Sequence, residues 1–194
     1  MDIDKTLRDT ALLAARLTLG GSLAMHGAQK MFGIQDGPGL GGTAQMMNNL
    51  GFKPGERFAP VVAATEISAG TMIALGALGP IGPAMLLSTM LVAIETVHRP
   101  KGYWNSGGGY EMNAMYIMLA LVLANEGYGS ISLDEMFGLR EKLRPMHGWI
   151  SAIGGVAAAL FMLAQRKTEQ PQTASPDKPS QNGATPREEV GSGV

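Results

Sequence analysis

The stretch FAPVVAATEISAGTMIALGAL, residues 58–78, decides the fold class of this chain. It contains one formal charge, on Glu66, so a helix built from it has no charged face of the kind that surface helices of soluble proteins normally keep. A bilayer core about 30 Å thick needs roughly 20 apolar residues per helix, and this stretch is long enough. It therefore predicts a membrane-spanning helix. The alternative is a soluble protein with unusually hydrophobic core helices.

Further hydrophobic segments lie on both sides of this stretch. The motif GPIGP, residues 79–83, predicts a tight turn into the next helix. The flanking helical segments are residues 10–32, 81–97, 109–124 and 146–165. We therefore expect an all-α protein, a membrane-embedded four-helix bundle within residues 10–134 with an additional C-terminal hydrophobic helix.

The other parts of the chain are expected to differ in character from this bundle. Residues 1–9 are predicted to be an N-terminal leader, and residues 135–166 an amphipathic connector followed by the last hydrophobic helix. The glycine-rich connection at 33–57 is long enough to fold over the bundle as a lid or to lie along the lipid head groups. Residues 167–194 have almost no large apolar side chains to offset chain entropy, so we predict a disordered polar tail.

The overall composition excludes several classes of function. Lys and Arg number 15 and Asp and Glu 16, so the chain carries no excess of positive charge with which to bind nucleic acid. Cysteine is absent, which removes disulfides, thiolate nucleophiles and dithiol redox cycles from this chain. Any redox chemistry must therefore use a cofactor or a partner.

Ionisable residues within the apolar segments are the candidate functional residues, because a charge at membrane depth is costly unless it faces the protein or water. Steps of three and four from Glu66 reach small residues, which indicates that its side chain points at a neighbouring helix. His26 and Lys30 end the first segment, His98 ends the third and Glu111 opens the fourth. We expect these five residues to form a buried polar cluster.

Two interpretations of this cluster stay open. In the functional one, Lys30 pairs with a carboxylate and a histidine passes protons. In the structural one, an interhelical ion pair fixes how the helices pack and performs no chemistry. The sequence Glu95-Thr96-Val97-His98 matches the Glu-x-x-His pattern of di-iron helix bundles, but such sites need two copies and this chain has one. We therefore predict no metal site.

Five motifs carry a resemblance to a known family. They are HGAQKMFG at 26–33, EISAG at 66–70, His98, GYE at 109–111 and GYGSISLD at 127–134. In order and spacing over residues 12–134 they resemble the DoxX family. The resemblance adds Gly27, Gly70, Ser132, Leu133 and Asp134 as motif residues. It implies a four-helix integral membrane protein, often a subunit of oxidoreductase systems linked to quinone, thiosulfate or thiol-stress chemistry.

On this basis we expect a multi-pass protein of the bacterial cytoplasmic (inner) membrane. Its expected partners are the lipid bilayer and a membrane or peripheral oxidoreductase subunit. We expect it to bind no nucleic acid. The first functional hypothesis is an accessory subunit whose polar cluster contacts a quinone or supports the partner. The alternatives are a small proton-coupled transporter in which Glu66 titrates, and a non-catalytic scaffold. The hydrophobic segment after residue 135 departs from the family pattern and would place the two termini on opposite faces if it crosses the membrane.

Overall fold

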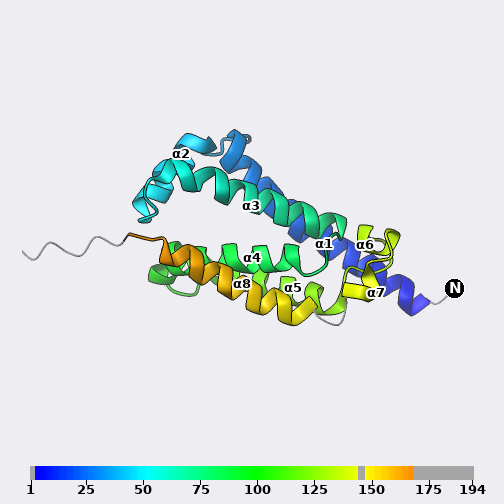
Figure 1. The fold of residues 1–194 in the computed structure, drawn as a ribbon. Helices are drawn as coiled ribbons and strands as arrows, with labels where there is room; N and C mark the ends of the chain where they lie inside the picture. Colours follow the sequence, from blue (N-terminus) through cyan, green and yellow to red (C-terminus); the bar gives the residue numbers. More distant parts are fainter. Residues whose placement is uncertain (1–2, 144–146, 168–194) are drawn as a thin grey trace, which may run out of the picture.

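The computed structural model describes residues 3–143 and 147–167, and every regular element within them is helical (Figure 1). The long helices are α1 (Ile3–Phe32), α3 (Gly55–Leu75), α4 (Ile81–Ala93), α5 (Glu111–Glu126) and α8 (His147–Ala164). The shorter ones are α2 (Gly39–Asn49), the π-helix η1 (Ile94–His98), the 3-10 turns η2 (Arg99–Lys101) and η3 (Asn105–Gly107), α6 (Leu133–Met136) and α7 (Arg140–Leu143). This arrangement confirms the predicted all-α bundle with an additional C-terminal helix. The predicted polar tail lies outside the described residues, apart from Lys167.

The helices form two layers that meet at one end of the molecule. Helices α1, α2 and α3 pack on one another, and α4, α5 and α8 form the second group. The turn from α3 to α4 joins the groups at the end that also holds α6 and α7 (Figure 1). Across the layers, α3 contacts α4 and α1 contacts α5.

Small residues bring α1 and α3 into backbone contact. A methyl group on Gly20 would lie 2.6 Å from the backbone nitrogen of Ala74, and one on Gly27 would lie 2.6 Å from that of Ile67. Gly70 is equally close to the backbone of Ala24. In lipid, where apolar side chains gain little by leaving the solvent, such close approach is a main source of helix association.

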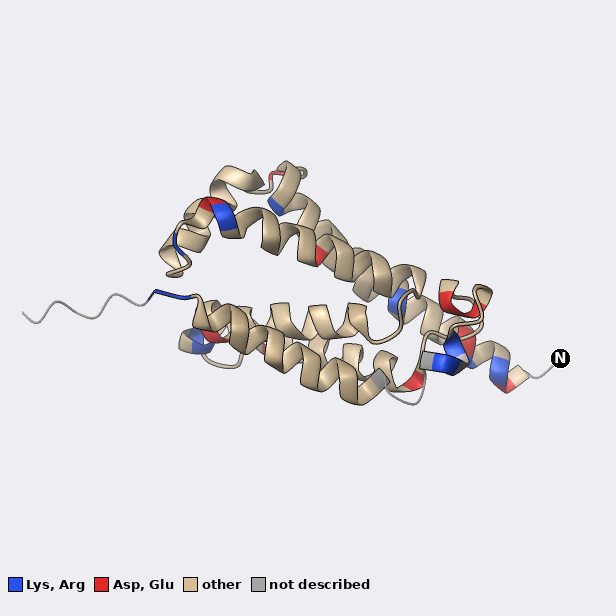
Figure 2. Cartoon of the chain, viewed as in Figure 1, with Lys and Arg blue, Asp and Glu red and all other residues tan. Residues whose placement is uncertain are grey.

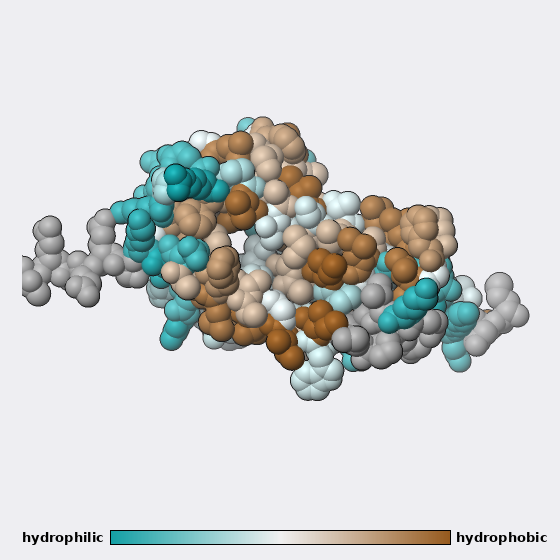
Figure 3. Space-filling model, viewed as in Figure 1, coloured by the Kyte–Doolittle hydropathy of each residue, from teal (hydrophilic) through white to brown (hydrophobic). Residues whose placement is uncertain are grey.

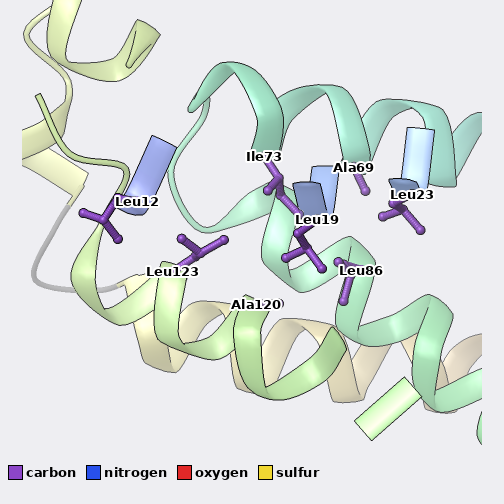
Figure 4. Packing of buried hydrophobic residues seen from close by; sticks show 8 residues of the cluster. All are labelled: Leu12, Leu19, Leu23, Ala69, Ile73, Leu86, Ala120 and Leu123. Carbon is purple, nitrogen blue, oxygen red and sulfur yellow. The ribbon is translucent and has the colours of Figure 1, made fainter. Parts of the chain in front are cut away.

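The hydrophobic core lies where the two layers converge. Leu19 and Leu23 of α1 pack with Ile73 of α3, Leu86 of α4 and Leu123 of α5 (Figure 4). Each of these side chains is buried. The core therefore ties four of the long helices together at this end and leaves the opposite ends of the layers less tightly joined.

The outer surface of the long helices is suited to lipid. Two stretches of the described residues, Gly55–Leu75 and Ile81–Lys101, are long and apolar enough to cross a membrane. In the most apolar window of Gly55–Leu75 only 33% is buried, whereas the core helix of a soluble protein would be mostly buried. Helix α8 also exposes Trp149, Ile153 and Phe161. Charged residues gather toward the two ends of the molecule (Figure 2), and hydrophobic surface covers much of the length between them (Figure 3).

Helix boundaries differ from the sequence expectations in three places. Helix α1 begins at Ile3, so residues 3–9 of the predicted leader are its first turns, and an acidic Asp4 in the first turn suits the helix dipole. Helix α3 begins at Gly55 and ends at Leu75, and the next residue, Gly76, is a left-handed helix cap with a φ of 66°. The first part of the predicted connector contains the end of α6 and the short helix α7.

Two neighbouring glycines of α1 give a matched test of the α1–α3 contact. We expect Gly20→Ala to destabilise the protein by about 1–3 kcal/mol, because the added methyl group meets the α3 backbone. A methyl group on Gly21 would have nothing within 4 Å, so Gly21→Ala should instead stabilise the helix by about 0.5–1 kcal/mol. Thermal unfolding of the detergent-purified variants measures both effects, and equal behaviour of the two would contradict close packing at Gly20.

Candidate functional site

An ion pair joins α1 to α3 within the apolar body of the protein. The Lys30 ammonium, in the last turn of α1, donates to Oε1 of Glu66 in the middle of α3. The Glu66 side chain is 4% exposed and that of Lys30 is 23% exposed. The pair is the part of the predicted polar cluster that the structure brings together. Its burial in an apolar setting makes each partner costly without the other.

A cavity of about 370 Å³ opens beside this pair. It lies between α2 and α3 on one side and α4, η1 and α8 on the other. Its walls are mainly apolar and include Met47, Phe52, Met85, Val97 and Phe161. Small-molecule sites in proteins have this character, an apolar wall of a few hundred Å³ with a few polar groups that orient the ligand.

Lys30 and Glu66 are the only charged residues among the described residues that line the cavity. Three threonines also line it, but their hydroxyl groups already donate to the carbonyl one turn earlier in their own helices. Thr65 donates to Val61, Thr89 to Met85 and Thr96 to Val92, at 2.7 to 2.9 Å. The polar groups that remain for a ligand are therefore the ion pair and the hydroxyl of Ser88, which also lines the cavity.

The second oxygen of the Glu66 carboxylate does not take part in the ion pair. Oε2 of Glu66 is buried and has no hydrogen-bond partner among the described residues. A buried acceptor without a donor costs about 1–3 kcal/mol, and more when it is charged. A molecule in the cavity that presents an O–H or N–H group to Oε2 would remove this cost.

The far wall of the cavity contains an irregular helix. After Ala93, helix α4 continues as the π-helix η1, and Thr96 and Val97 from this segment line the cavity. Single π-turns inside helices occur frequently at functional sites, because the wider turn places side chains where a regular helix would not. This feature agrees with a ligand site at this position.

The other predicted cluster residues have hydrogen-bond partners outside the ion pair. Nδ1 of His98 donates to the carbonyl of Gly108 at 2.7 Å, and Glu111 accepts from the backbone N–H of Asn105 at 3.0 Å. Both bonds brace the connection between α4 and α5. His26 is exposed and lies 3.3 Å from the Gln29 side chain. The prediction of one five-residue cluster was therefore wrong for these three, because local backbone groups satisfy His98 and Glu111.

The Glu-x-x-His segment is likewise engaged elsewhere. Both carboxylate oxygens of Glu95 accept from Arg99 at 2.7 and 2.9 Å, an exposed pair one turn apart. Within residues 3–143 and 147–167 no group of three or more His, Cys, Asp or Glu side chains is placed to hold a metal ion.

The GYGSISLD segment, residues 127–134, binds the backbone of the turn between α3 and α4, and we call this contact the clasp. Asp134 is buried, and its carboxylate accepts from the backbone N–H groups of Leu78 and Gly79 at 2.8 and 2.7 Å. Leu78 has a φ of 60°, which a leucine rarely adopts, so these bonds hold a strained turn. Ser132 caps the short helix that contains Leu133 and Asp134. The glycine motif residues, Gly27 and Gly70, lie in the α1–α3 contact described above.

Sequence reasoning did not single out Arg16, which is the largest fully buried side chain at this end. Its guanidinium donates to the carbonyl of Ile131 and lies 5.8 Å from the centroid of the Tyr128 ring. Its Nε and Nη1 have no partner among the described residues. The signal was present, since Arg16 interrupts the apolar part of α1, but its partners come from a distant loop.

Two further polar contacts support the loop that carries Asp134. The Ser130 hydroxyl donates to the Asp9 carboxylate and so ties the loop to α1. Burial raises the pKa of Tyr128 well above its ordinary value, so its hydroxyl stays protonated and donates to the carbonyl of Gly79 at 2.8 Å. The loop is therefore held both to the first helix and to the turn that it clasps.

Replacing Asp134 should loosen the turn. In Asp134→Asn one side-chain oxygen remains for two backbone donors, so we expect a loss of about 1–3 kcal/mol in stability. The matched control is Glu135→Gln, which removes an exposed pair with Arg140 and should cost about 1 kcal/mol or less. Thermal unfolding in detergent compares them, and an equal loss in the two variants would argue against the clasp.

Substitutions of Lys30 and Glu66 should have strongly coupled effects on stability. Lys30→Met or Glu66→Gln alone should destabilise the protein by about 3 kcal/mol, because each leaves its partner buried without a counter-charge. The double variant should lose clearly less than the sum of the two. A double-mutant cycle on unfolding midpoints measures the coupling, and simple additivity would show that the two side chains act separately.

Comparison with known proteins adds one finding to this geometry. Residues 11–99 match the DoxX family model, a range that includes Lys30, Glu66 and His98 and ends before Glu111 and the Ser132–Asp134 motif. Neither the curated proteins nor the solved structures gave a match. Residues 11–99 supply α1, α2, α3, α4 and η1, and thus both partners of the ion pair. Over these residues the chain therefore contains a DoxX domain, and DoxX is a family of membrane proteins.

Proposed function

We propose that this protein is an accessory subunit of a membrane oxidoreductase system and binds the head group of a quinone in the cavity beside Lys30 and Glu66. The observation that carries the proposal is the unpartnered Oε2 of Glu66, a residue that lines an apolar cavity. A quinone suits this site, because its polar ring can pair with the charged groups and its apolar tail can pack on the apolar walls. The Lys30 ammonium would donate to a quinone carbonyl, and Oε2 of Glu66 would accept from the hydroxyl of the reduced form.

The character of the cavity supports a lipid-borne ligand. Its lining is mostly aliphatic, aromatic and methionine side chains, which suit a ring and a hydrocarbon tail. Methionine side chains are flexible and adapt to the shape of a guest, and Met46, Met47, Met85 and Met162 all line this cavity. A charged, fully water-soluble substrate would find one ion pair and little other polar surface.

An accessory role follows from the chemistry available in the chain. With no cysteine, the protein cannot itself perform thiol–disulfide exchange. Its own residues bind the quinone and orient its oxygens, and a partner subunit supplies or accepts the electrons. We place this assembly in the bacterial cytoplasmic membrane, with α1, α3, α4, α5 and α8 as crossing helices.

Binding of decyl-ubiquinone tests the proposal. Wild-type protein in detergent should bind this short-tailed quinone, and Glu66→Gln and Lys30→Met should each weaken binding by about 10- to 100-fold, the range for losing a hydrogen bond to a charged group. Ala158→Phe should also block binding, because Ala158 lines the cavity and the larger ring fills it without any change of charge. Quenching of intrinsic tryptophan fluorescence or equilibrium dialysis measures the affinity.

Glu95→Gln is the matched control, since it removes a carboxylate from an exposed pair outside this cavity. It should bind decyl-ubiquinone as the wild type does. Undiminished binding in both Glu66→Gln and Ala158→Phe would overturn the cavity as the quinone site. Monodisperse elution of each variant in size-exclusion chromatography separates loss of binding from loss of folding.

A proton-coupled carrier is the second candidate, because the same buried carboxylate belongs to a residue that lines the cavity and has one oxygen without a partner. The carrier hypothesis requires that proteoliposomes containing the protein move protons with a substrate and that Glu66→Gln abolishes this movement. The accessory-subunit proposal requires no such flux. A pH-sensitive dye inside the liposomes therefore distinguishes the two functions.

A further inference from the structure

We propose that a second, basic pocket at the end of α8 binds the phosphate group of an anionic phospholipid. This pocket is distinct from the quinone cavity and has a volume of about 160 Å³. It lies between the connection from α2 to α3 and the end of the described C-terminal segment. The proposal does not depend on what the larger cavity binds.

The two walls of this pocket are fixed to each other by hydrogen bonds. Nε of Arg166 donates to the carbonyl of Leu50 at 2.6 Å, and the backbone N–H of Lys167 donates to the carbonyl of Gly51 at 2.7 Å. Arg166 is half-buried, so its position is set by packing as well as by this bond. The pocket is therefore a built feature of the fold and not a chance gathering of surface side chains.

The lining of the pocket is strongly biased in charge. Lys53, Arg166 and Lys167 contribute three positive charges, and none of the described residues that line it is acidic. Asn48 and Asn49 add side-chain amides. Because Oδ1 of Asn48 already accepts from the backbone N–H of Gly55 at 2.7 Å, the group it can offer a ligand is its NH₂ donor. Cations and amide donors together match an anion with several oxygens.

Phosphate fits this donor set better than a carboxylate does. The Arg166 guanidinium is a planar group with several N–H donors, which suits phosphate oxygens, and lysine ammonium groups add charge without directional demands. A phosphodiester offers two charged oxygens and further ester oxygens to donors that surround it. A carboxylate would leave part of this set without an acceptor.

The position of the pocket favours a lipid as the source of the phosphate. Helix α8 is apolar up to Ala164 and exposes large hydrophobic side chains, and the two basic residues follow directly after it. Hydrophilic surface begins at this end of the molecule, beside the hydrophobic body (Figure 3). Basic residues at the end of an apolar helix lie at the level of lipid head groups, and basic pockets at this level bind anionic lipids.

The test compares phosphatidylglycerol with phosphatidylcholine of the same acyl chains, titrated onto the full-length protein in detergent and followed by native mass spectrometry. The wild type should bind phosphatidylglycerol more tightly. Lys53→Gln combined with Lys167→Gln should weaken this binding roughly 25-fold, about fivefold for each positive charge removed near the head group. Arg166→Lys keeps the charge but loses the planar donors, and should have a smaller effect.

The matched control is Arg99→Gln combined with Lys101→Gln, which removes the same charge from exposed residues outside the pocket. It should retain wild-type selectivity. If the two double variants lose phosphatidylglycerol equally, the attraction comes from overall charge and the proposed site is wrong. If inorganic phosphate binds the wild type with the same dependence on Lys53 and Lys167 and displaces the lipid at similar concentration, the pocket is a site for free phosphate and the lipid assignment fails.

Discussion

Each charge buried in the helical body needs a partner within the protein, and this requirement governs the structure. Lipid cannot solvate an ion, so a charged side chain in the helical body must find a partner on another helix or loop. Lys30 and Glu66 meet this need across α1 and α3. Arg16 meets it only in part, through the carbonyl of Ile131 and the ring of Tyr128. The close backbone contact between α1 and α3 follows from the same solvent, because small residues rather than hydrophobic burial hold helices together there.

The two ends of the molecule differ in construction, and the difference places the candidate site. At one end the hydrophobic core, Arg16 and the Asp134 clasp hold the layers together. Toward the other end the layers enclose the cavity, and the bonds from Arg166 and Lys167 to the connection between α2 and α3 join them. An apolar cavity with a single ion pair thus lies away from the end where the hydrophobic core and the clasp hold the layers together.

The helical segments and the ion pair could be predicted well from the sequence, because both follow from short-range rules. A run of 21 residues with one charge implies a span, and a carboxylate inside it implies a partner. The predicted five-residue cluster failed at His98 and Glu111 because the intervening loop folds back and supplies their partners, which helix periodicity cannot foresee. Arg16 was visible as an interruption, yet its acceptor lies 115 residues away in sequence. Helix ends were the least accurate feature: α3 ends at Leu75, three residues before the end of the predicted span, at a left-handed cap on Gly76.

The clasped turn between α3 and α4 also affects how the two layers can move relative to each other. Leu78 and Gly79 both adopt left-handed backbone angles, and a single carboxylate holds their amides. At the other end of the molecule, Arg166 and Lys167 donate to the connection between α2 and α3. The two layers are therefore tethered at both ends of the cavity, which limits how far they can separate around Glu66.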